Sequence, residues 1–406
     1  MVICGQRTFF VSGGGDDSNP GTQAAPYRQI QRAVSTAEPG DLILVDAGTY
    51  SSVYLQGFSG QPSAWLGIMS LSDAVLPLCF EADGDVIAVN GSTYVGIYGF
   101  DVAGTQTSSN TNGSGICIYG NSHNVVVWKN TVHDLPGGGI NCFDVNDHYG
   151  FGSTDMLDIS FNTIYNTSCY SPSATSGISI YASRDLTNGA TWDGTYANRI
   201  VGNYIFNVQN LVPYSVGGYS YITDGNAVSI DSLLTTYDYT KRVLIEGNLL
   251  VGCGGRAVHA YNSINVDGVG NTGIGNLRTV SPAITGGCEF DGTTNASVNY
   301  HGNVIFPRNT PNWSDSTSTF TNNAVLGGSQ PVTGSNINRQ SVGYPYFAGS
   351  LDDAELLAMQ PVELFAPVTP DLVPREAGSL GWQTLGVGTR PPSIWAAGSL
   401  EATSAA

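Results

Sequence analysis

Two kinds of short strand-like segment repeat in the same phase through the middle of the chain. The first kind begins with Gly or Ala and then alternates apolar with other residues; it occurs at 115–119, 139–143, 177–181, 227–231 and 257–261. The second kind follows an asparagine and continues with apolar residues; these asparagines are Asn130, Asn162, Asn203, Asn248, Asn303 and Asn323. Strands that repeat in phase are typical of solenoids, and Asn and Gly at the corners favour a parallel β-helix. The repeats therefore predict an all-β solenoid.

Stacking would turn matched positions of the first strand kind into columns of neighbours about 4.8 Å apart. Two of these columns are apolar and are predicted to face the core, because side chains alternate between faces with period two. The residues between and beside them are then predicted to face outward. The first outward column is Cys117, Asn141, Ser179, Ser229 and His259, and the second outward column is Tyr119, Phe143, Tyr181, Asp231 and Tyr261.

The second outward column is an aromatic stripe interrupted by one carboxylate. Exposed stacked aromatics are unusual on a soluble surface, and an aromatic face packs well on the apolar face of a sugar ring. We therefore predict that Tyr119, Phe143, Tyr181 and Tyr261 bind a glycan substrate. A long loop that covers these side chains, or a contact between subunits, is the alternative interpretation.

Asp231, Asp224 and His259 are the candidate catalytic residues. Hydrolysis of a glycosidic bond uses two carboxyl groups about 5 to 10 Å apart. Asp224 would approach Asp231 only if the chain turns at Gly225. His259 can act as a general acid or base near neutral pH. The alternative is that Asp231 only hydrogen-bonds a sugar or a loop. The predicted polar contacts with the substrate are Arg256, which opens the strand of His259, and Asp144, a second potential partner of Asp231.

The charge balance limits the partners of the chain. The net charge is −18, charged residues make up only 11% of the sequence, and Lys129 and Lys241 are the only lysines. No nucleic-acid partner is expected on this basis, because phosphate contacts need basic residues. An acidic polysaccharide is disfavoured, because it would be repelled unless a cation intervened.

No cofactor is predicted from the sequence. The 7 cysteines include no CxxC pair, so neither a disulfide framework nor a zinc site is implied. Ca²⁺ remains possible at two clusters of oxygen ligands, 16–19 and the group Asp144, Asn146 and Asp147, although capping of turns by these side chains explains them more simply. No apolar run is long enough to span a membrane, and the first residues lack the pattern of a signal peptide.

The chain divides by pattern into three parts. Residues 1–50 are predicted to form an N-terminal cap with a strand at 9–11, an amphipathic helix within 27–37 and a strand at 42–45. Residues 51–345 are predicted to be β-helix coils, with long groove-side loops expected at 144–155, 184–198, 212–224 and 261–287. Residues 346–406 form an irregular, Pro-rich tail that would pack on the solenoid or contribute to assembly.

The stretch from residue 9 to 50 and the repeats from about 85 to 327 resemble the right-handed parallel β-helix proteins of the pectate-lyase-like superfamily. The resemblance implies a right-handed parallel β-helix. It implies activity poorly, because the superfamily includes polysaccharide lyases, glycoside hydrolases, epimerases, phage tailspikes and non-enzymes. Its lyases typically use a Lys or Arg base with Ca²⁺ held by carboxylates, and this sequence shows no convincing match to that constellation.

The absent signal peptide, the scarcity of lysine and the aromatic stripe together favour a virion-associated protein that recognises cell-surface polysaccharide, with depolymerisation left open. Similarity to tailspikes would make it a homotrimer, with an extracellular or virion location and virion proteins as partners of the tail. The alternatives are a secreted glycoside hydrolase or polysaccharide lyase, of which the hydrolase fits the carboxylates better, and a non-catalytic structural solenoid.

Overall fold

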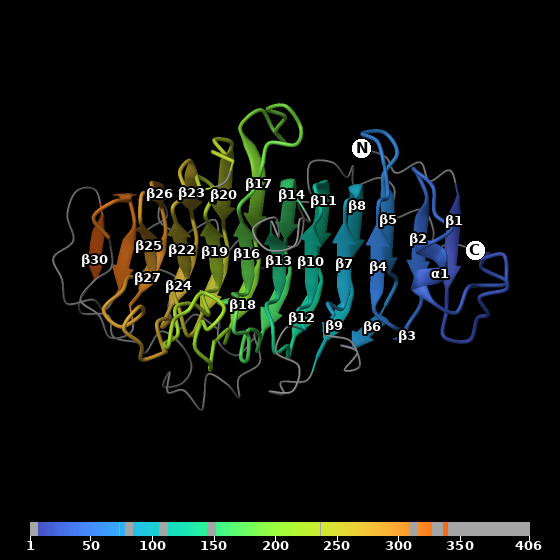
Figure 1. Cartoon of the computed structure of the whole chain (residues 1–406), viewed down its shortest axis with the longest axis horizontal. Helices are drawn as coiled ribbons and strands as arrows, with labels where there is room; N and C mark the ends of the chain where they lie inside the picture. The colour runs from blue at the N-terminus through green and yellow to red at the C-terminus, as the bar shows by residue number, and fades with distance from the viewer. Residues whose placement is uncertain are drawn as a thin grey trace.

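The computed structural model describes residues 7–72, 74–77, 84–104, 113–143, 152–235, 237–307, 315–326 and 336–339. Its strands form three parallel sheets that run side by side along an elongated molecule (Figure 1). Sheet I has eleven strands: β1 (Thr8–Val11), β2 (Leu42–Val45), β5 (Leu66–Ser70), β8 (Thr93–Tyr98), β11 (Ser122–Trp128), β14 (Thr154–Ser160), β17 (Tyr196–Val201), β20 (Arg242–Glu246), β23 (Val266–Val269), β26 (Val298–His301) and β28 (Thr319–Thr321).

Sheet II has eight strands: β4 (Val53–Gln56), β7 (Ile87–Asn90), β10 (Ile116–Tyr119), β13 (Ile140–Phe143), β16 (Ile178–Tyr181), β19 (Val228–Asp231), β22 (Val258–Tyr261) and β25 (Phe290–Thr293). Sheet III has eleven strands: β3 (Gly48–Thr49), β6 (Ala74–Pro77), β9 (Asp101–Ala103), β12 (Thr131–His133), β15 (Thr163–Tyr165), β18 (Tyr204–Phe206), β21 (Leu249–Val251), β24 (Thr272–Ile274), β27 (Val304–Phe306), β29 (Ala324–Leu326) and β30 (Ile337–Arg339).

Each coil visits sheet II, then sheet I, then sheet III, and the next coil pairs with it in parallel. This order gives a parallel β-helix, as the sequence predicted. The predicted inward columns of sheet II are confirmed, because Ile140 pairs with Ile178 and Ile178 pairs with Val228 in the ladder, and all three are buried in the core. The interior is a stack of aliphatic layers that runs the length of the described coils.

Asparagines stack at the corner between sheets I and III. The Nδ2 of Asn203 donates to the Oδ1 of Asn248 at 3.0 Å, and that same Oδ1 accepts the backbone N–H of Asn203 at 2.8 Å. The pattern continues along a series that is buried except for the half-buried last member: Asn130, Asn162, Asn203, Asn248, Asn271, Asn303, Asn323 and Asn336. Each asparagine thus satisfies backbone groups that a tight corner would otherwise leave unpaired.

Asn271 belongs to this ladder, although the sequence repeats had left it out. The interval from Asn248 to Asn303 is two coils, with β23 and β24 in the first of them. The segment 261–287, which we expected to be a single inserted loop, therefore contains a complete pair of strands. Glycines replace the expected apolar residues at Gly268 and Gly273, so the repeat is hard to see in the sequence.

The first rung carries the helix α1 (Ile30–Val34), which lies inside the stretch where the sequence placed one. Ile30, Ala33 and Val34 are buried, and α1 contacts β1, β2 and β4 at the N-terminal end of the solenoid (Figure 1). A helix at this place covers core residues that no earlier coil can cover. The Pro-rich tail lies outside the described residues.

The long loops leave both edges of sheet II, which differs from the sequence prediction. We expected all of them to follow the aromatic-bearing strands, and 184–198 does follow β16. In contrast, 207–227 joins β18 to β19 and 275–289 joins β24 to β25, so both precede strands of sheet II. In Figure 1 the segment before β17 rises on one side of the strands, and the segment between β18 and β19 lies on the other.

Candidate functional site

The second outward column is present in the register that the sequence predicted. Phe143 pairs with Tyr181, Tyr181 with Asp231, and Asp231 with Tyr261 on adjacent strands of sheet II. Tyr119 extends the column, because its ring stacks on that of Phe143 with centroids 5.4 Å apart and planes 17° apart. Tyr261 is 39% exposed and the other members are half-buried, so the column is at the surface.

The first outward column points away from the core but is largely covered. Cys117, Asn141, Ser229 and His259 are all buried, and the next member, Asp291 on β25, is buried as well. Loops along this edge of sheet II provide the cover; for example, Asn141 donates to the Oγ of Ser114. His259 is therefore enclosed in protein, unlike the solvent-facing histidine that the sequence suggested.

His259 is held by a buried carboxylate. Its Nδ1 lies 2.6 Å from Oδ1 of Asp291, and the Nε of Arg256 binds the other oxygen of that carboxylate. Burial alone would raise the pKa of Asp291, but His259 and Arg256 beside it hold the pKa below its usual value. An ionised Asp291 accepts the Nδ1 proton, which leaves Nε2 of His259 as the basic nitrogen.

Arg256 has a different place from the one predicted. Its guanidinium is buried, and Nη2 donates to the carbonyl of Ala283 at 2.7 Å while Nε binds Asp291. In this position Arg256 orients Asp291 and does not project over the outer face of sheet II. The predicted substrate contact Asp144 lies outside the described residues.

Asp224 comes back toward Asp231 because the chain turns at Gly225. Gly225 has φ +88°, and a Cβ at this position would lie 2.6 Å from the backbone nitrogen of Asn210, so only glycine fits. Asp224 receives a hydrogen bond of 2.8 Å from Asn226. The left-handed backbone of Gly225 is compatible with the turn that the sequence required, and the charge of Asp224 acts on Asp231.

Asp231 is the perturbed carboxyl group of this site. Burial is the main cause that raises its pKa and the nearby charge of Asp224 adds to it, while a hydrogen bond from Ser232 and the proximity of His259 lower it; the resulting pKa is about 6. Asp231 and His259 lie on adjacent strands, two residues apart in register, since Ser229 pairs with His259 and Asp231 with Tyr261. Diagonal neighbours of this kind are about 7 to 8 Å apart at the backbone, within reach of a shared ligand.

Tyrosines from the loop 207–227 stand beside the two carboxyls. Burial raises the pKa of Tyr214, and the negative charges of Asp231 and Asp224 raise it further, which places its hydroxyl near both. Its ring stacks on Tyr219 with centroids 5.5 Å apart, and Tyr219 meets Tyr221 edge to face. All three lie in the predicted groove-side loop 212–224, so the sequence alone places them as additional glycan-facing aromatics.

Exposed large apolar side chains gather around the same place. Ser281 donates to the carbonyl of Ile222 and so joins the loop 275–289 to the loop 207–227. Of the seven exposed large apolar residues in the described part of the chain, five belong to these two loops or to β22: Leu211, Val216, Tyr219, Tyr261 and Val280. We call the surface formed by these loops and by β19 and β22 the candidate site.

Asp291 is the residue of the site that sequence reasoning did not assign to it. The strand of Asp291 reads Phe-Asp-Gly-Thr, and its glycine stands where the earlier repeats have an apolar residue, so the repeat count stopped one coil too early. The long interval between β22 and β25 hid it further. No sequence signal connects Tyr214 with Asp231, because the two come close only through the folding of the irregular loop 207–227.

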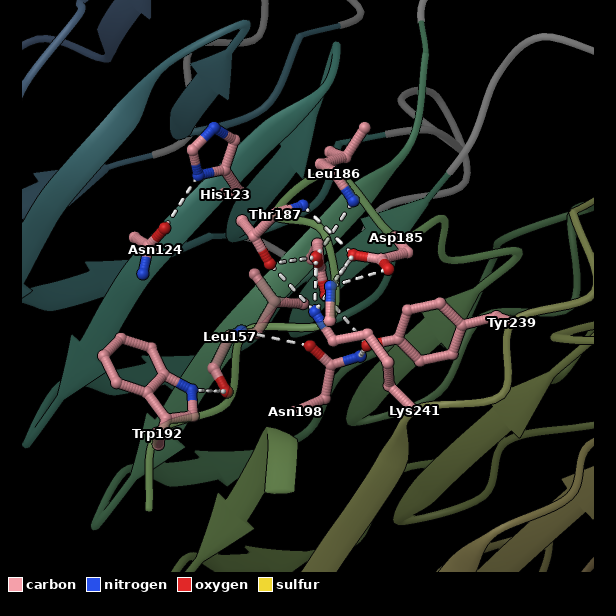
Figure 2. Close-up of polar contacts among 12 residues, drawn as sticks. His123, Asn124, Leu157, Asp185, Leu186, Thr187, Trp192, Asn198, Tyr239 and Lys241 are labelled. Atoms are coloured by element: carbon pink, nitrogen blue, oxygen red, sulfur yellow. Dashed lines mark hydrogen bonds and ion pairs between the residues drawn. The ribbon is translucent and has the colours of Figure 1, made fainter. Parts of the chain in front are cut away.

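A second polar network lies at the opposite edge of sheet II (Figure 2). Lys241 Nζ lies 2.8 Å from Oδ2 of Asp155, 2.9 Å from the hydroxyl of Thr187 and 3.3 Å from Asp185. Tyr239 donates to the other oxygen of Asp155 at 2.9 Å. Figure 2 shows the labelled side chains of Lys241, Thr187, Asp185 and Tyr239 converging. Because this buried lysine has three acceptors, the network ties the loops on this edge to β14.

The described residues contain no evident metal-binding site. No three His, Cys, Asp or Glu side chains gather in the described ranges in a way that suits a metal ion. In the 16–19 turn, Asp16 accepts from Ser18, and Asp17 accepts the backbone N–H groups of Arg28 and Gln29. These oxygens cap the turn, which was the simpler of our two interpretations; the group around Asp144 lies outside the described residues.

The remaining features of the described residues concern the cysteines and membrane-spanning helices. Cys117, Cys142, Cys169, Cys253 and Cys288 are buried and free. Among the described residues there is no helix of the length and apolarity needed to cross a membrane.

Comparison with known proteins supports the fold. A family model described as a protein of unknown function (DUF1565) matches residues 13–58. No curated protein matches the sequence. Among solved structures, the chain is similar to the pectate lyase Pel9A, with a TM-score of 0.51 and 14% identity over 91% of each chain.

Two further solved structures match with lower TM-scores. A GH136 lacto-N-biosidase from Eubacterium ramulus has a TM-score of 0.49 and 12% identity, over 79% of this chain and 56% of that one. An alginate lyase from Paenibacillus sp. str. FPU-7 has a TM-score of 0.40 and 17% identity, over 77% of this chain and 99% of that one. The coils, their parallel register and the match to Pel9A together make the fold of this chain a right-handed parallel β-helix.

Proposed function

We propose that the protein is a glycoside hydrolase that binds a polysaccharide across the outer face of sheet II and cleaves it at the candidate site. The observation that carries the proposal is Asp231, a carboxyl group with a pKa raised to about 6 inside an aromatic column. A raised pKa keeps a carboxyl protonated in mildly acidic solution, as a general acid requires. Its neighbours in the column, Tyr181 and Tyr261, provide surfaces on which sugar rings can stack.

The proposed step needs one acid and one base. Asp231 donates its proton to the glycosidic oxygen while the bond from that oxygen to the anomeric carbon breaks. A water molecule attacks the anomeric carbon, and its proton passes to Nε2 of His259. Asp291 stabilises the positive imidazole that results, and Arg256 keeps Asp291 ionised and in place. Asp224 maintains the raised pKa of Asp231 through its negative charge.

The charges around the site favour an uncharged glycan. None of the eight strands of sheet II contains a lysine or an arginine. Arg256, the cation beside the site, is already bound to Asp291 and to a backbone carbonyl. A chain of uronic acids would therefore meet Asp224 and Asp231 without a free cation from sheet II to balance it. A neutral sugar polymer meets no such repulsion.

The proposal is tested by turnover on a panel of neutral and acidic polysaccharides from bacterial surfaces and plants. New reducing ends and the ultraviolet absorbance of unsaturated sugars are followed together, with Asp231→Asn in parallel. Reducing ends without absorbance, lost in the variant, are the expected result. Absorbance that rises with the reducing ends would identify a lyase and overturn the roles given to Asp231 and His259.

The location and assembly of the protein are a separate proposal. We propose that it acts outside the cell or on a virion surface, as a homotrimer, with the tail available for contact with virion proteins. The support is the scarcity of lysine, the net charge of −18 and the surface aromatic column, which suit a stable particle that meets glycans. Light scattering at micromolar concentration tests the assembly, and a monomer there would contradict it.

A further inference from the structure

The loops that join sheet II to sheets I and III contain few basic side chains, and most of these are bound within the fold. Their lysines and arginines are Arg184, Lys241, Arg256 and Arg278. Lys241 and Arg256 are each held by a buried aspartate. Arg278 donates to a side-chain amide and to a backbone carbonyl. These three charges are therefore used to hold the loops in place.

Arg184 differs from the other three. It is exposed, and among the described residues its side chain makes no ion pair and no hydrogen bond. Its guanidinium lies over the ring of Tyr237, with the guanidinium carbon 5.3 Å from the ring centroid. The next residue, Asp185, accepts hydrogen bonds from Lys241 and from the backbone N–H of Gly189 instead. The N–H groups of Arg184 are thus available to a ligand, while the ring beneath limits the movement of the guanidinium.

Arg184 and Tyr237 belong to the edge of sheet II at which Asp231 lies. Asp231 is the last residue of β19 and Tyr181 is the last residue of β16, so both lie where these loops leave the sheet. The backbone N–H of Ala182 donates to the carbonyl of Asp231 at 2.9 Å, and Arg184 follows two residues later. Tyr237 lies in the loop that begins directly after Asp231. The pair therefore borders the aromatic column beside the candidate acid.

We propose that Arg184 binds two adjacent hydroxyl groups of the sugar unit that lies beside Asp231, and that Tyr237 holds the guanidinium in position for this contact. The inference rests on the proposed function, because it takes the glycan to lie along the aromatic column. A guanidinium presents parallel N–H donors in one plane, which match two neighbouring oxygen atoms. A guanidinium already held on a ring loses less conformational entropy when the sugar binds. Arg184 thus selects sugars whose adjacent hydroxyls face this edge.

An acidic group is the other ligand that a free guanidinium could bind. It is disfavoured because Asp185 follows Arg184 directly and Asp224 and Asp231 lie near the same rung, so the edge carries no net positive charge. The two ligands also respond differently to salt. Salt screens the attraction between a guanidinium and an anionic group, whereas hydrogen bonds to neutral hydroxyls depend little on it.

The experiment measures KM and kcat of wild type and Arg184→Leu on galactomannan, arabinoxylan and a β-glucan as neutral probes, and on polygalacturonate as the acidic probe. On the neutral probe that wild type cleaves, Arg184→Leu should raise KM about 10- to 100-fold, with kcat within about threefold. Arg28→Leu is the matched control, because it removes an exposed arginine of the N-terminal cap and should leave KM unchanged.

The outcomes separate this inference from the proposed function. An unchanged KM in Arg184→Leu, with turnover lost in Asp231→Asn, would overturn the inference and leave the proposed function standing. Absence of turnover by wild type on every probe would count against the proposed function alone. Affinity electrophoresis in gels that contain the same probes then decides, since retardation that Arg184→Leu abolishes supports the contact, and equal mobility of the two proteins overturns it.

Further variants test the chemistry of the contact. Arg184→Lys keeps the charge but lacks the planar fork, and it should still raise KM at least about fivefold. Wild-type KM in Arg184→Lys, or a KM of wild type that rises steeply with salt, would assign the contact to an acidic group and overturn the proposal. Tyr237→Phe keeps the ring and should behave as wild type, whereas Tyr237→Leu should raise KM about threefold. Equal KM in the two Tyr237 variants would overturn the positioning role of the ring.

Discussion

Asp231 illustrates what a sequence can and cannot say about a single residue. Its place in the aromatic column follows from period-two alternation and in-phase repeats, and both can be recognised in the amino-acid sequence. Its raised pKa depends on burial and on Asp224, which the chain brings near through the turn at Gly225 and the loop 207–227. An irregular loop has no sequence periodicity from which its path can be predicted. The sequence could therefore predict Asp224 as a partner of Asp231 only on the condition that the chain turns at Gly225.

The raised pKa of Asp231 predicts how stability depends on pH. The pKa rises from an ordinary 3.8 to about 6 in the folded chain, so folding favours the protonated form. Its stabilising contribution is complete below about pH 4 and is lost as the pH rises through about 6, by at most about 3 kcal/mol. Asp231→Asn should lose this dependence.

Thermal unfolding of wild type and Asp231→Asn between pH 4 and pH 8 measures the difference. The variant should gain stability relative to wild type as the pH rises. A constant difference across this range would mean that Asp231 titrates normally and is well solvated.

His259 and Asp291 are predicted to act as a unit. Asp291→Asn keeps the size of the side chain but removes the charge that stabilises the imidazole after it takes a proton. We expect kcat to fall about 10²- to 10⁴-fold, with little change in KM, and His259→Gln to show a similar loss.

The double variant is the decisive control for this pair. If the two residues act as a unit, combining the substitutions should add little to the loss that either causes alone. Fully multiplicative losses would show independent roles, and a change confined to KM would assign the pair to substrate binding.

At the scale of elements, the asparagine ladder defines the corners of the β-helix, and most of it could be read from the sequence. Asparagine at a fixed phase before an apolar strand is a strong signal, and six members were found from it. Asn271 was missed because glycines replace apolar residues in the strands on either side of it. The loops were all predicted on one edge of sheet II because the spacing of the repeats does not show whether an insertion precedes or follows a strand. Register was predictable wherever apolar residues alternate.

Asn248→Ala should destabilise the coils. The substitution removes the acceptor of the Asn203 backbone N–H and side chain, and it leaves these buried groups unpaired. We expect a loss of about 2 to 4 kcal/mol in the free energy of unfolding, measured by denaturant titration. Asn299→Ala is the control, because Asn299 is an exposed asparagine with one side-chain hydrogen bond, and it should change stability by less than about 1 kcal/mol. Equal losses of unfolding free energy in the two variants would show that the asparagine ladder does not stabilise the coils specifically.

The network around Lys241 is predicted to keep the loops on the second edge in place. Asp155→Ala would leave Lys241 and the hydroxyl of Tyr239 buried without their shared carboxylate. We expect a loss of about 3 to 5 kcal/mol, with faster hydrogen exchange in 184–198. Asp185→Ala, which removes an exposed partner of the same lysine, should cost less than about 1 kcal/mol. Similar costs for both variants would show that the network does not depend on the buried pair.

At the scale of the whole molecule, the fold follows from the repeats, whereas the activity does not. Stacked strands dictate a solenoid, and a solenoid offers a long, regular face suited to a long, regular polymer. In the proposed function, cleavage of that polymer depends on a few side chains at the rungs of β19, β22 and β25, and on the loops beside them. The similarity to Pel9A extends over nearly the whole of both chains, but at 14% identity it shows only that the two chains share a fold.

The central claim is that Asp231 acts as the general acid of a glycan-cleaving site. The most direct test is kcat/KM on the polysaccharide that the panel identifies, for wild type and Asp231→Asn, from pH 4 to pH 8. The account predicts that wild-type activity falls about tenfold for each pH unit above about 6, and that the variant loses at least about 10²-fold at pH 5. Wild-type rates in the variant, or activity that rises through pH 6, would contradict it.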